Sequence, residues 1–350
     1  MPEQTKQLRL LVVRLSAMGD ILHALPAVTA LREAHPEWRI GWAVEPQWKP
    51  LLASEDATVR GPQMPLVDGV HLVPAREWAR SPLSLKTMRE VRRVRRELRA
   101  EQYDVCVDLQ GALRSAVIAK WARAKRLIGE DAPRERLARY FFKERVRTSG
   151  VHVIEQAMEV MNSVAEERLP ECRALLPQDA EAEGKASALA TPFVLLIPGA
   201  GWGAKRWPAE RYAELAIRLR DAGYAIVVNA GPGEESLANE VATLSDGAAT
   251  VLRSSITELI AVTRRAALVI GGDTGPLHLA SALGKPVVGI FGPTDPARNG
   301  PFGGRFRVLR HPESRRDHTR RSAPEAGLLT ITPESVMTAA MELLQKEPVA

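Results

Sequence analysis

The sequence predicts an α/β protein made of two doubly wound domains, and three observations carry this prediction. Short apolar runs alternate with helical patterns, which is typical of βαβ units around a parallel sheet. The alternation occurs twice, and a small, acidic and polar stretch at residues 178–190 separates the two series, which we interpret as a linker. A length of 350 residues also suits two hydrophobic cores better than one.

The first half starts with the nearly continuous apolar run LRLLVVRL at residues 8–15, as expected of a parallel strand covered on both faces. A helical pattern follows through residue 31, and Pro26 either starts its regular part or kinks it. Further strands are expected at residues 39–44, 70–73 and 105–109. Further helices are expected at residues 82–100, after the strand at residues 105–109 to about residue 123, and at residues 151–164.

The second half repeats the alternation. Its strands are expected at residues 193–197, 225–229, 267–270 and 286–291, and its helices at residues 208–220, 234–244, 256–264, 277–283 and 333–345.

The composition is that of an ordinary soluble globular protein, with 45% apolar and 26% charged residues. No apolar run approaches the roughly 18 residues that a membrane span needs. Residues 1–6 are polar and lead directly into a strand, so no signal peptide is expected. Cys106 and Cys172 are too few and too isolated for a disulfide framework or a zinc site. The simplest expectation is a cytoplasmic protein.

The net charge of +6 is unevenly distributed along the chain. Residues 76–147 contain 20 Lys and Arg against 10 Asp and Glu, so the rest of the chain is slightly acidic. Such a basic region should face nucleic acid, a phosphorylated lipid or an anionic membrane surface. Its arginine-rich helix lacks interleaved aromatic residues, which weakens the case for single-stranded nucleic acid. A solvated basic face is the default interpretation of this helix, followed by contact with an acidic substrate.

The segment GGDTGPLH at residues 271–278 connects an apolar run to a helical pattern. Its glycines let the backbone approach a ligand closely. Asp273 or Thr274 can cap the helix, and Pro276 suits its first turn. A helix start with free N–H groups at the carboxyl end of a strand is a ready anion site. The segment therefore predicts a phosphate site, and the alternative is an ordinary turn between a strand and a helix.

Asp20 follows the first strand, in the segment SAMGD, and His23 lies three residues later. On a helix the two side chains would share a face. A carboxylate at the carboxyl end of a strand is well placed to act as a general base. The alternative is that Asp20 only begins or caps the helix. His23 considered alone is more often a partly buried, satisfied histidine.

The glycine-rich segment PGAGWGAKRWP at residues 198–208 follows the first strand of the second half. Lys205 offers a positive charge at its end, although the spacing excludes both a P-loop and a G-x-G-x-x-G motif. The alternative is a glycine-rich loop with a solvated lysine. Trp202 and Trp207 could stack on a base or a sugar, or one of them could belong to the core.

Glu234 and Glu235 follow the next strand, where a carboxylate could bind ribose hydroxyls as in dinucleotide folds. Equally, they could only complement the helix dipole. Other chemistries lack support, since the histidines show no metal-binding spacing and no G-x-S-x-G elbow is present.

Three motifs together resemble glycosyltransferase family 9, the family of the lipopolysaccharide heptosyltransferases: SAMGDILHALPA, PGAGWGAKRWP and GGDTGPLHLASALGKPVVGIFGPTDP. The resemblance covers about residues 8–300. It implies a GT-B fold, in which two Rossmann-like domains face each other across a cleft. Residues 1–185 would form the acceptor-binding domain and residues 186–332 the nucleotide-sugar-binding domain. The helix within residues 333–350 would pack back on the N-terminal domain.

The resemblance also implies an activity, the transfer of L-glycero-D-manno-heptose from ADP-heptose to Kdo of the lipopolysaccharide inner core, with inversion and with no metal or cofactor. The start SAMGD and the ending GPTDP look more like the heptosyltransferase I branch than the heptosyltransferase II branch. The implied partners are ADP-heptose, phosphorylated Kdo-lipid A and, transiently, the cytoplasmic face of the inner membrane, but no nucleic acid. The alternatives are heptosyltransferase II, a relative with another acceptor, a nucleotide-sugar epimerase and a basic nucleic-acid-binding protein.

Individual residues match the motifs of the family. Asp20 matches the catalytic base, and its neighbours on the acceptor side are Ser16, Gly19 and His23. The residues that match the donor site are Gly201, Lys205 (phosphates), Glu234 or Glu235 (ribose), Asp273, Thr274 and Gly275 (pyrophosphate turn), and His278 (donor sugar). Some members carry hydroxyls and acids before the lysine, where this chain has Ala200, Gly201 and Gly203, so phosphate contacts there would come from backbone N–H groups.

Overall fold

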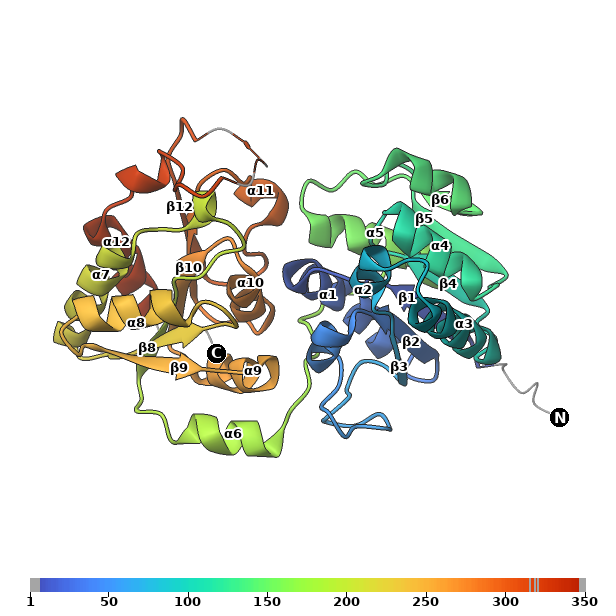
Figure 1. Cartoon of the computed structure of the whole chain (residues 1–350), viewed down its shortest axis with the longest axis horizontal. Helices are drawn as coiled ribbons and strands as arrows, with labels where there is room; N and C mark the ends of the chain where they lie inside the picture. Colours follow the sequence, from blue (N-terminus) through green and yellow to red (C-terminus); the bar gives the residue numbers. More distant parts are fainter. Residues whose placement is uncertain (1–6, 315, 318, 320, 346–350) are drawn as a thin grey trace. The chain divides into compact units, whose positions relative to one another are not determined.

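The computed structural model describes residues 7–314, 316–317, 319 and 321–345 of the chain. The expectation about a signal peptide at residues 1–6 therefore lies outside the described residues, as do the last five residues. The chain divides into two compact units, residues 1–178 and 179–350 (Figure 1).

The N-terminal unit contains a six-stranded sheet in the order β3-β2-β1-β4-β5-β6, in which all neighbouring strands are parallel. Its strands are β1 (Arg9–Val13), β2 (Arg39–Val44), β3 (Gly69–Leu72), β4 (Val105–Asp108), β5 (Arg126–Glu130) and β6 (Glu144–Val146). Its helices are α1 (Met18–Ala34), α2 (Ala75–Arg80), α3 (Leu85–Ala100), α4 (Leu113–Trp121) and α5 (Val153–Ala165), with 3-10 turns η1 (Pro46–Leu51) and η2 (Arg136–Phe141).

The C-terminal unit repeats this topology in a second parallel sheet of the order β12-β11-β10-β7-β8-β9. Its strands are β7 (Phe193–Ile197), β8 (Ala225–Ala230), β9 (Ala249–Arg253), β10 (Leu268–Gly272), β11 (Val287–Phe291) and β12 (Phe306–Arg310). Its helices are α6 (Ala180–Ser187), α7 (Ala209–Asp221), α8 (Glu235–Leu244), α9 (Ile256–Arg265), α10 (Gly275–Ala282), α11 (Pro296–Asn299) and α12 (Pro333–Leu344), with η3 (Gly203–Lys205) and η4 (Leu328–Thr330).

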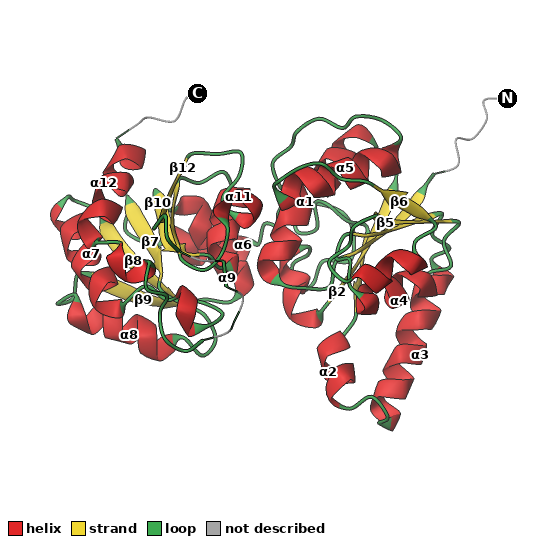
Figure 2. Ribbon diagram, turned by 90° about the horizontal axis from the view of Figure 1, so that it is seen from above, coloured by secondary structure: helices red, strands yellow, loops and turns green. Residues whose placement is uncertain are grey.

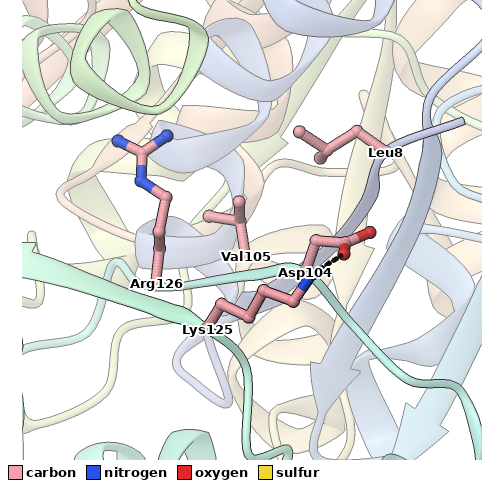
Figure 3. Close-up of a pocket in the computed structure, with 5 residues that line it drawn as sticks. All are labelled: Leu8, Asp104, Val105, Lys125 and Arg126. Carbon is pink, nitrogen blue, oxygen red and sulfur yellow. Dashed lines mark hydrogen bonds and ion pairs between the residues drawn. The ribbon is translucent and has the colours of Figure 1, made fainter. Parts of the chain in front are cut away.

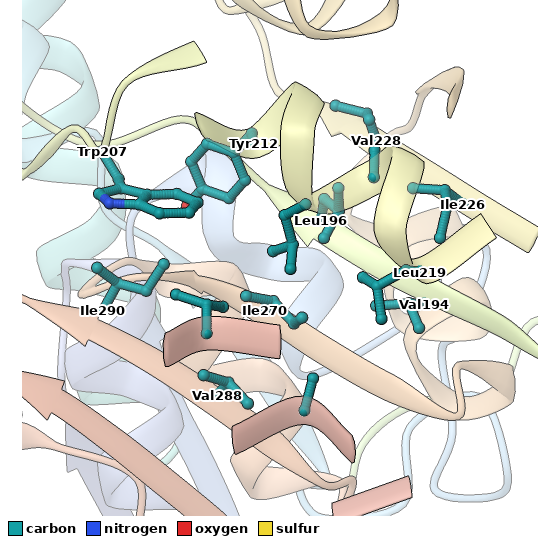
Figure 4. Packing of buried hydrophobic residues seen from close by; sticks show 14 of the residues in the cluster. Val194, Leu196, Trp207, Tyr212, Leu219, Ile226, Val228, Ile270, Val288 and Ile290 are labelled. Atoms are coloured by element: carbon teal, nitrogen blue, oxygen red, sulfur yellow. The ribbon is translucent and has the colours of Figure 1, made fainter. Parts of the chain in front are cut away.

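Each sheet is covered by helices on both faces, which confirms the doubly wound architecture (Figure 2). In the N-terminal unit, α1 packs on α5 over one face, and the core on the other face combines residues of α3 and α4 with those of the strands. In the C-terminal unit, α7, α8 and α12 contribute to one continuous apolar cluster with the sheet (Figure 4). The central strands are buried along their whole length, as parallel strands between two layers must be.

The stretch at residues 178–190 is not an irregular linker, and the domain boundary falls after residue 178 rather than after residue 185. Asp179 accepts a hydrogen bond from the N–H of Ala182 at 3.0 Å and so caps α6. Lys185 pairs with Glu258 of α9 at 2.9 Å, and Arg264 of α9 pairs with Glu183 at 2.6 Å. The acidic composition reflects ion pairs on a surface helix, and α6 belongs to the C-terminal unit.

The C-terminal helix α12 packs within the C-terminal unit, and its packing on the N-terminal domain, which the resemblance implies, stays a prediction. Its buried residues Val336, Ala339, Ala340 and Leu343 belong to the core of the C-terminal unit, together with α7 and the strands β10 and β11. The apolar face of α12 is therefore used within its own unit. None of the described helices is both long enough and apolar enough to cross a membrane.

Candidate functional site

The strand order of each unit defines one place where a ligand is expected. In both sheets the chain starts in the middle, runs to one edge, and then returns to extend the sheet on the other side. The direction reverses between β1 and β4 in the N-terminal unit and between β7 and β10 in the C-terminal unit. Open α/β sheets bind ligands outside the carboxyl ends of the strands at such a switch point. All the strongest candidates from the sequence follow these strand ends.

Asp20 lies at the switch point of the N-terminal unit, in the first turn of α1. Its Oδ1 pairs with Nη2 of Arg14 at 3.0 Å, and its Oδ2 accepts a hydrogen bond from the N–H of Ala17 at 3.1 Å. The side chain remains 40% exposed. Asp20 therefore stabilises the start of the helix and at the same time presents its carboxylate to solvent. A role at the helix start and a role as a general base are compatible.

Arg14, which the sequence reasoning missed, connects the two strand ends of this switch point. Besides pairing with Asp20, its guanidinium donates to the carbonyl of Leu109, the residue after β4. The Oε1 of Gln110 accepts a hydrogen bond from the N–H of Leu15 at 2.8 Å. The sequence signal for Arg14 is that it is the one charged residue within the apolar run at residues 10–15.

Asp108, at the end of β4, is fully buried and organises the turn that follows it. Its carboxylate accepts hydrogen bonds from the N–H groups of Gln110 at 2.8 Å and Gly111 at 3.0 Å, and from Oγ of Ser115 at 2.8 Å. Burial raises the pKa of Asp108 to about 6, although these hydrogen bonds and the charge of Arg14 oppose the shift. Gly111 has a φ of +64°, which explains the glycine at this position.

His23 lies one turn after Asp20 but is buried between α1 and α5. Its ring meets the ring of His152 edge to face, with centroids 5.6 Å apart, and the Nδ1 of His152 accepts the N–H of Ile154 at the start of α5. Ser16 and Gly19 lie half-buried in the turn before Asp20 and in the first turn of α1. The geometry of His23 is that of a helix-packing histidine, and its role toward an acceptor remains a prediction.

Three donor-site candidates of the C-terminal unit form one buried cluster at the second switch point. The ammonium of Lys205, in η3 after β7, pairs with the carboxylate of Asp273, the residue after β10, and contacts its carbonyl at 3.5 Å. The Nε2 of His278, in α10, lies 2.9 Å from Oδ1 of the same carboxylate. The ammonium also lies over the ring of Trp202, 4.2 Å from its centroid. Asp273 therefore holds a lysine and a histidine in fixed positions.

The electrostatics of this cluster favour an ionised Asp273. Burial by itself would raise the pKa of the Asp273 carboxyl, but the hydrogen bond from His278 and the charges of His278 and Lys205 outweigh it and hold the pKa well below its usual range. The negative charge is thus matched inside the cluster. An ammonium has three N–H donors, so Lys205 can contact a phosphate while it remains paired with Asp273.

The start of α10 supplies further donors beside this cluster. Thr274 is the N-cap in an extended conformation, Pro276 stands in the first turn, and the side chain of Thr274 makes no capping hydrogen bond. Within the described residues, the buried hydroxyls of Thr274 and of Thr294, which follows β11, have no hydrogen-bond partner. Buried hydroxyls are normally satisfied, so these two are available to hydrogen-bond a polar ligand or a water molecule. The sequence signal for Thr294 is its place within the GPTDP motif.

The structure distinguishes the two candidate glutamates. The Glu234 carboxylate lies against the backbone of the loop after β7, so that a Cβ on Gly199 would come within 2.2 Å of all its carboxylate atoms. Burial raises the pKa of Glu234, and the backbone N–H of Gly231 opposes this shift. The pKa of Glu235 is lowered by hydrogen bonds from its own N–H and that of Gly233, as expected of a residue that complements a helix start.

The two tryptophans of the glycine-rich loop have different roles. Trp207 is a core residue whose Nε1 donates to the carbonyl of Ile331 at 2.9 Å. Trp202 is half-buried beside Lys205. Gly201 is exposed, and a Cβ there would meet nothing within 4 Å, whereas a Cβ on Gly203 would lie 1.6 Å from the carbonyl of Ser322. Of Gly201 and Gly203, packing requires only Gly203 to be a glycine.

A surface pocket of about 330 Å³ lies at the opposite edge of the N-terminal sheet (Figure 3). Its lining residues stand near the amino ends of β1, β4 and β5: Leu8, Asp104, Val105, Lys125 and Arg126. Its basic side chains are already paired, Lys125 with Asp104 at 3.4 Å and Arg126 with Glu144, outside the pocket lining, at 2.8 Å. It is therefore a poor candidate for chemistry. In the described part of the chain, no group of three His, Cys, Asp or Glu residues is arranged to hold a metal ion.

Comparison with known proteins identifies the family of the chain. The model of glycosyltransferase family 9 (heptosyltransferase) matches residues 91–328, which leaves the Asp20 segment outside the matched part. Lipopolysaccharide heptosyltransferase 1 of Pseudomonas aeruginosa is 30% identical over 300 residues, which cover 85% of this chain and 82% of that protein. Lipopolysaccharide heptosyltransferase 2 of Escherichia coli K12 is 25% identical over 367 residues, covering 97% of this chain and 99% of the other.

Solved structures show the same fold. The E. coli heptosyltransferase WaaC with ADP matches with a TM-score of 0.80 at 26% identity, over 96% of this chain and 100% of that one. E. coli heptosyltransferase II matches with a TM-score of 0.74 at 23% identity, over 97% and 99% of the two chains. The likeness to WaaC and the two Rossmann-type strand orders show the two-domain α/β fold of the GT-B class.

Proposed function

We propose that this chain, which belongs to glycosyltransferase family 9, is a heptosyltransferase that transfers heptose from ADP-heptose to Kdo of the lipopolysaccharide inner core. The observation that carries the proposal is the Lys205–Asp273–His278 cluster beside the start of α10. It lies where an α/β sheet of this topology binds a nucleotide, and it combines a cation with free helix N–H groups. The names of the relatives supply the sugar and the acceptor.

The donor side of the reaction needs stabilisation of a leaving diphosphate. Displacement of ADP from the anomeric carbon builds negative charge on the phosphates. Lys205 and the N–H groups of Gly275 and Leu277 at the start of α10 supply donors for that charge. Asp273 acts through its neighbours, because its carboxylate is occupied by Lys205 and His278. Glu234, rather than Glu235, is the proposed ribose ligand, since it lies against the loop that leads to Lys205.

The acceptor side needs a base that removes a proton from the attacking hydroxyl. We assign this role to Asp20, whose carboxylate is exposed while Arg14 and the N–H of Ala17 fix its orientation. The roles fall on different units, so neither unit alone should turn over substrate. ADP-heptose is consumed as a substrate, and the proposed mechanism needs no resident metal or cofactor.

The acceptor is a phosphorylated, lipid-anchored molecule, which suits the basic region at residues 76–147. The proposed location is therefore cytoplasmic, in transient contact with the inner face of the inner membrane. Nucleic acid is not a proposed partner, since the arginine-rich helix lacks exposed aromatic residues for base stacking.

The test is turnover of defined substrates. The protein is incubated with ADP-heptose and Kdo-lipid A, and both ADP release and the mass of the heptosylated lipid are followed. We expect ADP and heptosylated lipid in equal amounts. Absence of turnover with every Kdo-containing acceptor would overturn the assignment. Donor consumption without any acceptor would point to an epimerase or a hydrolase instead.

The second candidate is the activity of heptosyltransferase II, which the likeness to heptosyltransferase 2 over 97% of the chain supports. The same assay discriminates the two when it includes an acceptor that already carries one heptose. Faster turnover of Kdo-lipid A assigns the chain to heptosyltransferase I, and the reverse order assigns it to heptosyltransferase II.

A further inference from the structure

The helices α2 and α3, with the turn between them, form a hairpin (residues 75–100) that projects from the N-terminal unit (Figure 2). The chain enters the hairpin from the carboxyl end of β3 and leaves it toward the amino end of β4. The 16 residues of α3 span about 24 Å, whereas the four residues of β4 span only about 13 Å. The turn at residues 81–84 therefore overhangs the sheet on its carboxyl edge, the edge that carries Asp20.

The hairpin is held in this position by contacts at its base and along its length. Trp78 of α2 is buried in the core, and its Nε1 donates to Oε2 of Glu90 at 2.9 Å, which ties α2 to α3. Ser84 caps α3 by accepting the N–H of Thr87 at 3.1 Å, and Oγ1 of Thr87 donates to the carbonyl of Ser81 at 2.8 Å. The tip is thus a fixed structure that can present side chains to a partner.

The tip presents apolar side chains to solvent. Leu83 is 88% exposed, Leu85 is 68% exposed, and Met88, one turn into α3, is 38% exposed. Leu83 has the largest exposed fraction among the large exposed apolar side chains in the described part of the chain. Single exposed apolar residues are common on protein surfaces, but three within six residues on a projecting turn form a patch.

The patch is surrounded by positive charge. Residues 76–100 contain nine Lys and Arg against three Glu, a net charge of +6 that equals the net charge of the whole chain. Of the three acids, Glu77 and Glu90 both contact Lys86, and Glu97 contacts His71 and Arg93. Four exposed arginines of α3 make no ion pair within the described residues: Arg89, Arg92, Arg95 and Arg96.

From this combination we propose that the hairpin docks on an anionic lipid surface, with Leu83 and Leu85 inserted among the headgroups and the arginines of α3 on lipid phosphates. Apolar side chains at the end of a basic helix are the two signals that interfacial membrane binding needs. A second copy of the chain would bring two equally positive hairpins together. Nucleic acid would leave Leu83 and Leu85 without apolar contacts.

This inference extends the proposed function, because the carboxyl edge that carries Asp20 would then face a membrane in which a lipid-linked acceptor is anchored. It can nevertheless be tested without donor or acceptor, so its failure and the failure of the proposed function are distinguishable.

The test is co-sedimentation of the full chain with vesicles of phosphatidylcholine alone and of phosphatidylcholine with about 30% phosphatidylglycerol. We expect binding to the anionic vesicles that weakens with salt, because exposed charges are screened. The variant Leu83→Ser/Leu85→Ser should lower the partition coefficient about tenfold or more, since two inserted side chains are lost. The variant Arg89→Gln/Arg92→Gln/Arg96→Gln should lose binding to anionic vesicles only.

Val59→Ser is the matched control, since Val59 is 75% exposed in the loop between η1 and β3. It should bind vesicles as the wild type does. The proposal is overturned if Leu83→Ser/Leu85→Ser binds like the wild type, or if Val59→Ser loses binding equally. It is also overturned if the leucine variant changes only self-association in sedimentation equilibrium, because the patch would then be an interface between copies. All variants should unfold at the wild-type denaturant midpoint, because the changed side chains are exposed.

Turnover links the two proposals. Leu83→Ser/Leu85→Ser should transfer heptose to a water-soluble, deacylated acceptor as the wild type does, but should be slower on acceptor embedded in vesicles. If no acceptor is turned over, the proposed function fails and the vesicle result still decides the membrane contact.

Discussion

The two switch points of the molecule share a strand order but differ in how they hold a carboxylate. At the first, Asp20 is 40% exposed and paired with a single arginine. At the second, Asp273 has a side chain only 7% exposed and is paired with Lys205 and His278. The same topology thus yields an open carboxylate, which can exchange a proton with an incoming hydroxyl, and a closed one, which can only organise its neighbours. Burial, and not residue type, separates a proposed base from a positioning residue.

The sharpest test of this difference is Asp20→Asn, which keeps an acceptor for the N–H of Ala17 but removes the base. We expect turnover to fall by about 10³-fold, within the range for loss of a general base, with ADP affinity nearly unchanged. Steady-state kinetics and calorimetric titration with ADP measure the two quantities. An equal loss of ADP affinity would make Asp20 structural, and retained turnover would remove it as the base.

Asp273→Ala should act mainly on stability. It would leave the Lys205 ammonium buried without its carboxylate, and breaking a buried pair from one side costs about 3–5 kcal/mol. Asp20→Ala should cost less than about 1 kcal/mol, because its pair with Arg14 is partly exposed. Urea unfolding of both variants at pH 7 measures the free energies. Similar losses for the two variants would contradict the contrast between the open and the closed carboxylate.

The buried acids Asp108 and Asp273 should have opposite effects on stability as pH changes. Asp108, with a pKa raised to about 6, binds a proton more tightly in the folded state, so its contribution is lost as pH rises from about 4 through 6. Asp273 has a lowered pKa, so its ionised carboxylate stabilises the fold at pH values above the unfolded pKa of about 4. This contribution to stability is lost as pH falls through the folded pKa. Between pH 4 and pH 7, the free energy of unfolding of Asp108→Asn should therefore rise by about 2 kcal/mol relative to that of the wild type.

Denaturant unfolding of wild type and Asp108→Asn at several pH values measures this difference. A difference in unfolding free energy that stays constant with pH would show that Asp108 does not titrate in this range.

The smallest expected effect is a change in ADP affinity that tests whether Glu234 or Glu235 binds the ribose. Glu234→Gln should weaken ADP binding about tenfold, because a charged acceptor for the ribose hydroxyls is lost. Glu235→Gln is the matched control and should bind ADP as the wild type does, since Glu235 is held by N–H groups at the start of α8. Calorimetric titration of both variants decides between them. A larger loss for Glu235→Gln would reverse the assignment of the ribose ligand.

Most of the central strands could be predicted from the sequence, whereas three of the four edge strands could not. The run at residues 193–197 matches β7 in both bounds, because a strand covered on both faces must be apolar throughout. The edge strands β6, β9 and β12 are partly exposed and carry charged residues, so no apolar run marks them. β5, an inner strand, was missed because only three of its residues are buried.

The candidate residues followed from local patterns, but their partners did not. Asp273 was singled out by its position between a strand and a helix. Its pairing with Lys205, 68 residues earlier, depends on β7 and β10 lying side by side. Likewise, Arg14 reaches Leu109 because β1 and β4 are neighbours. These contacts join residues that are far apart in the sequence, so they depend on the strand order and cannot be predicted from a local pattern.

The sequence by itself therefore determined the fold class, the two alternating series of elements and the strand ends at which polar residues gather. These are consequences of periodicity and of residue type, which act locally along the chain. Only the tertiary structure decided that residues 180–187 form a helix of the C-terminal unit, that α12 packs within that unit, and which carboxylates are open or closed. Burial and pairing depend on what lies across the sheet, and no local pattern contains that information.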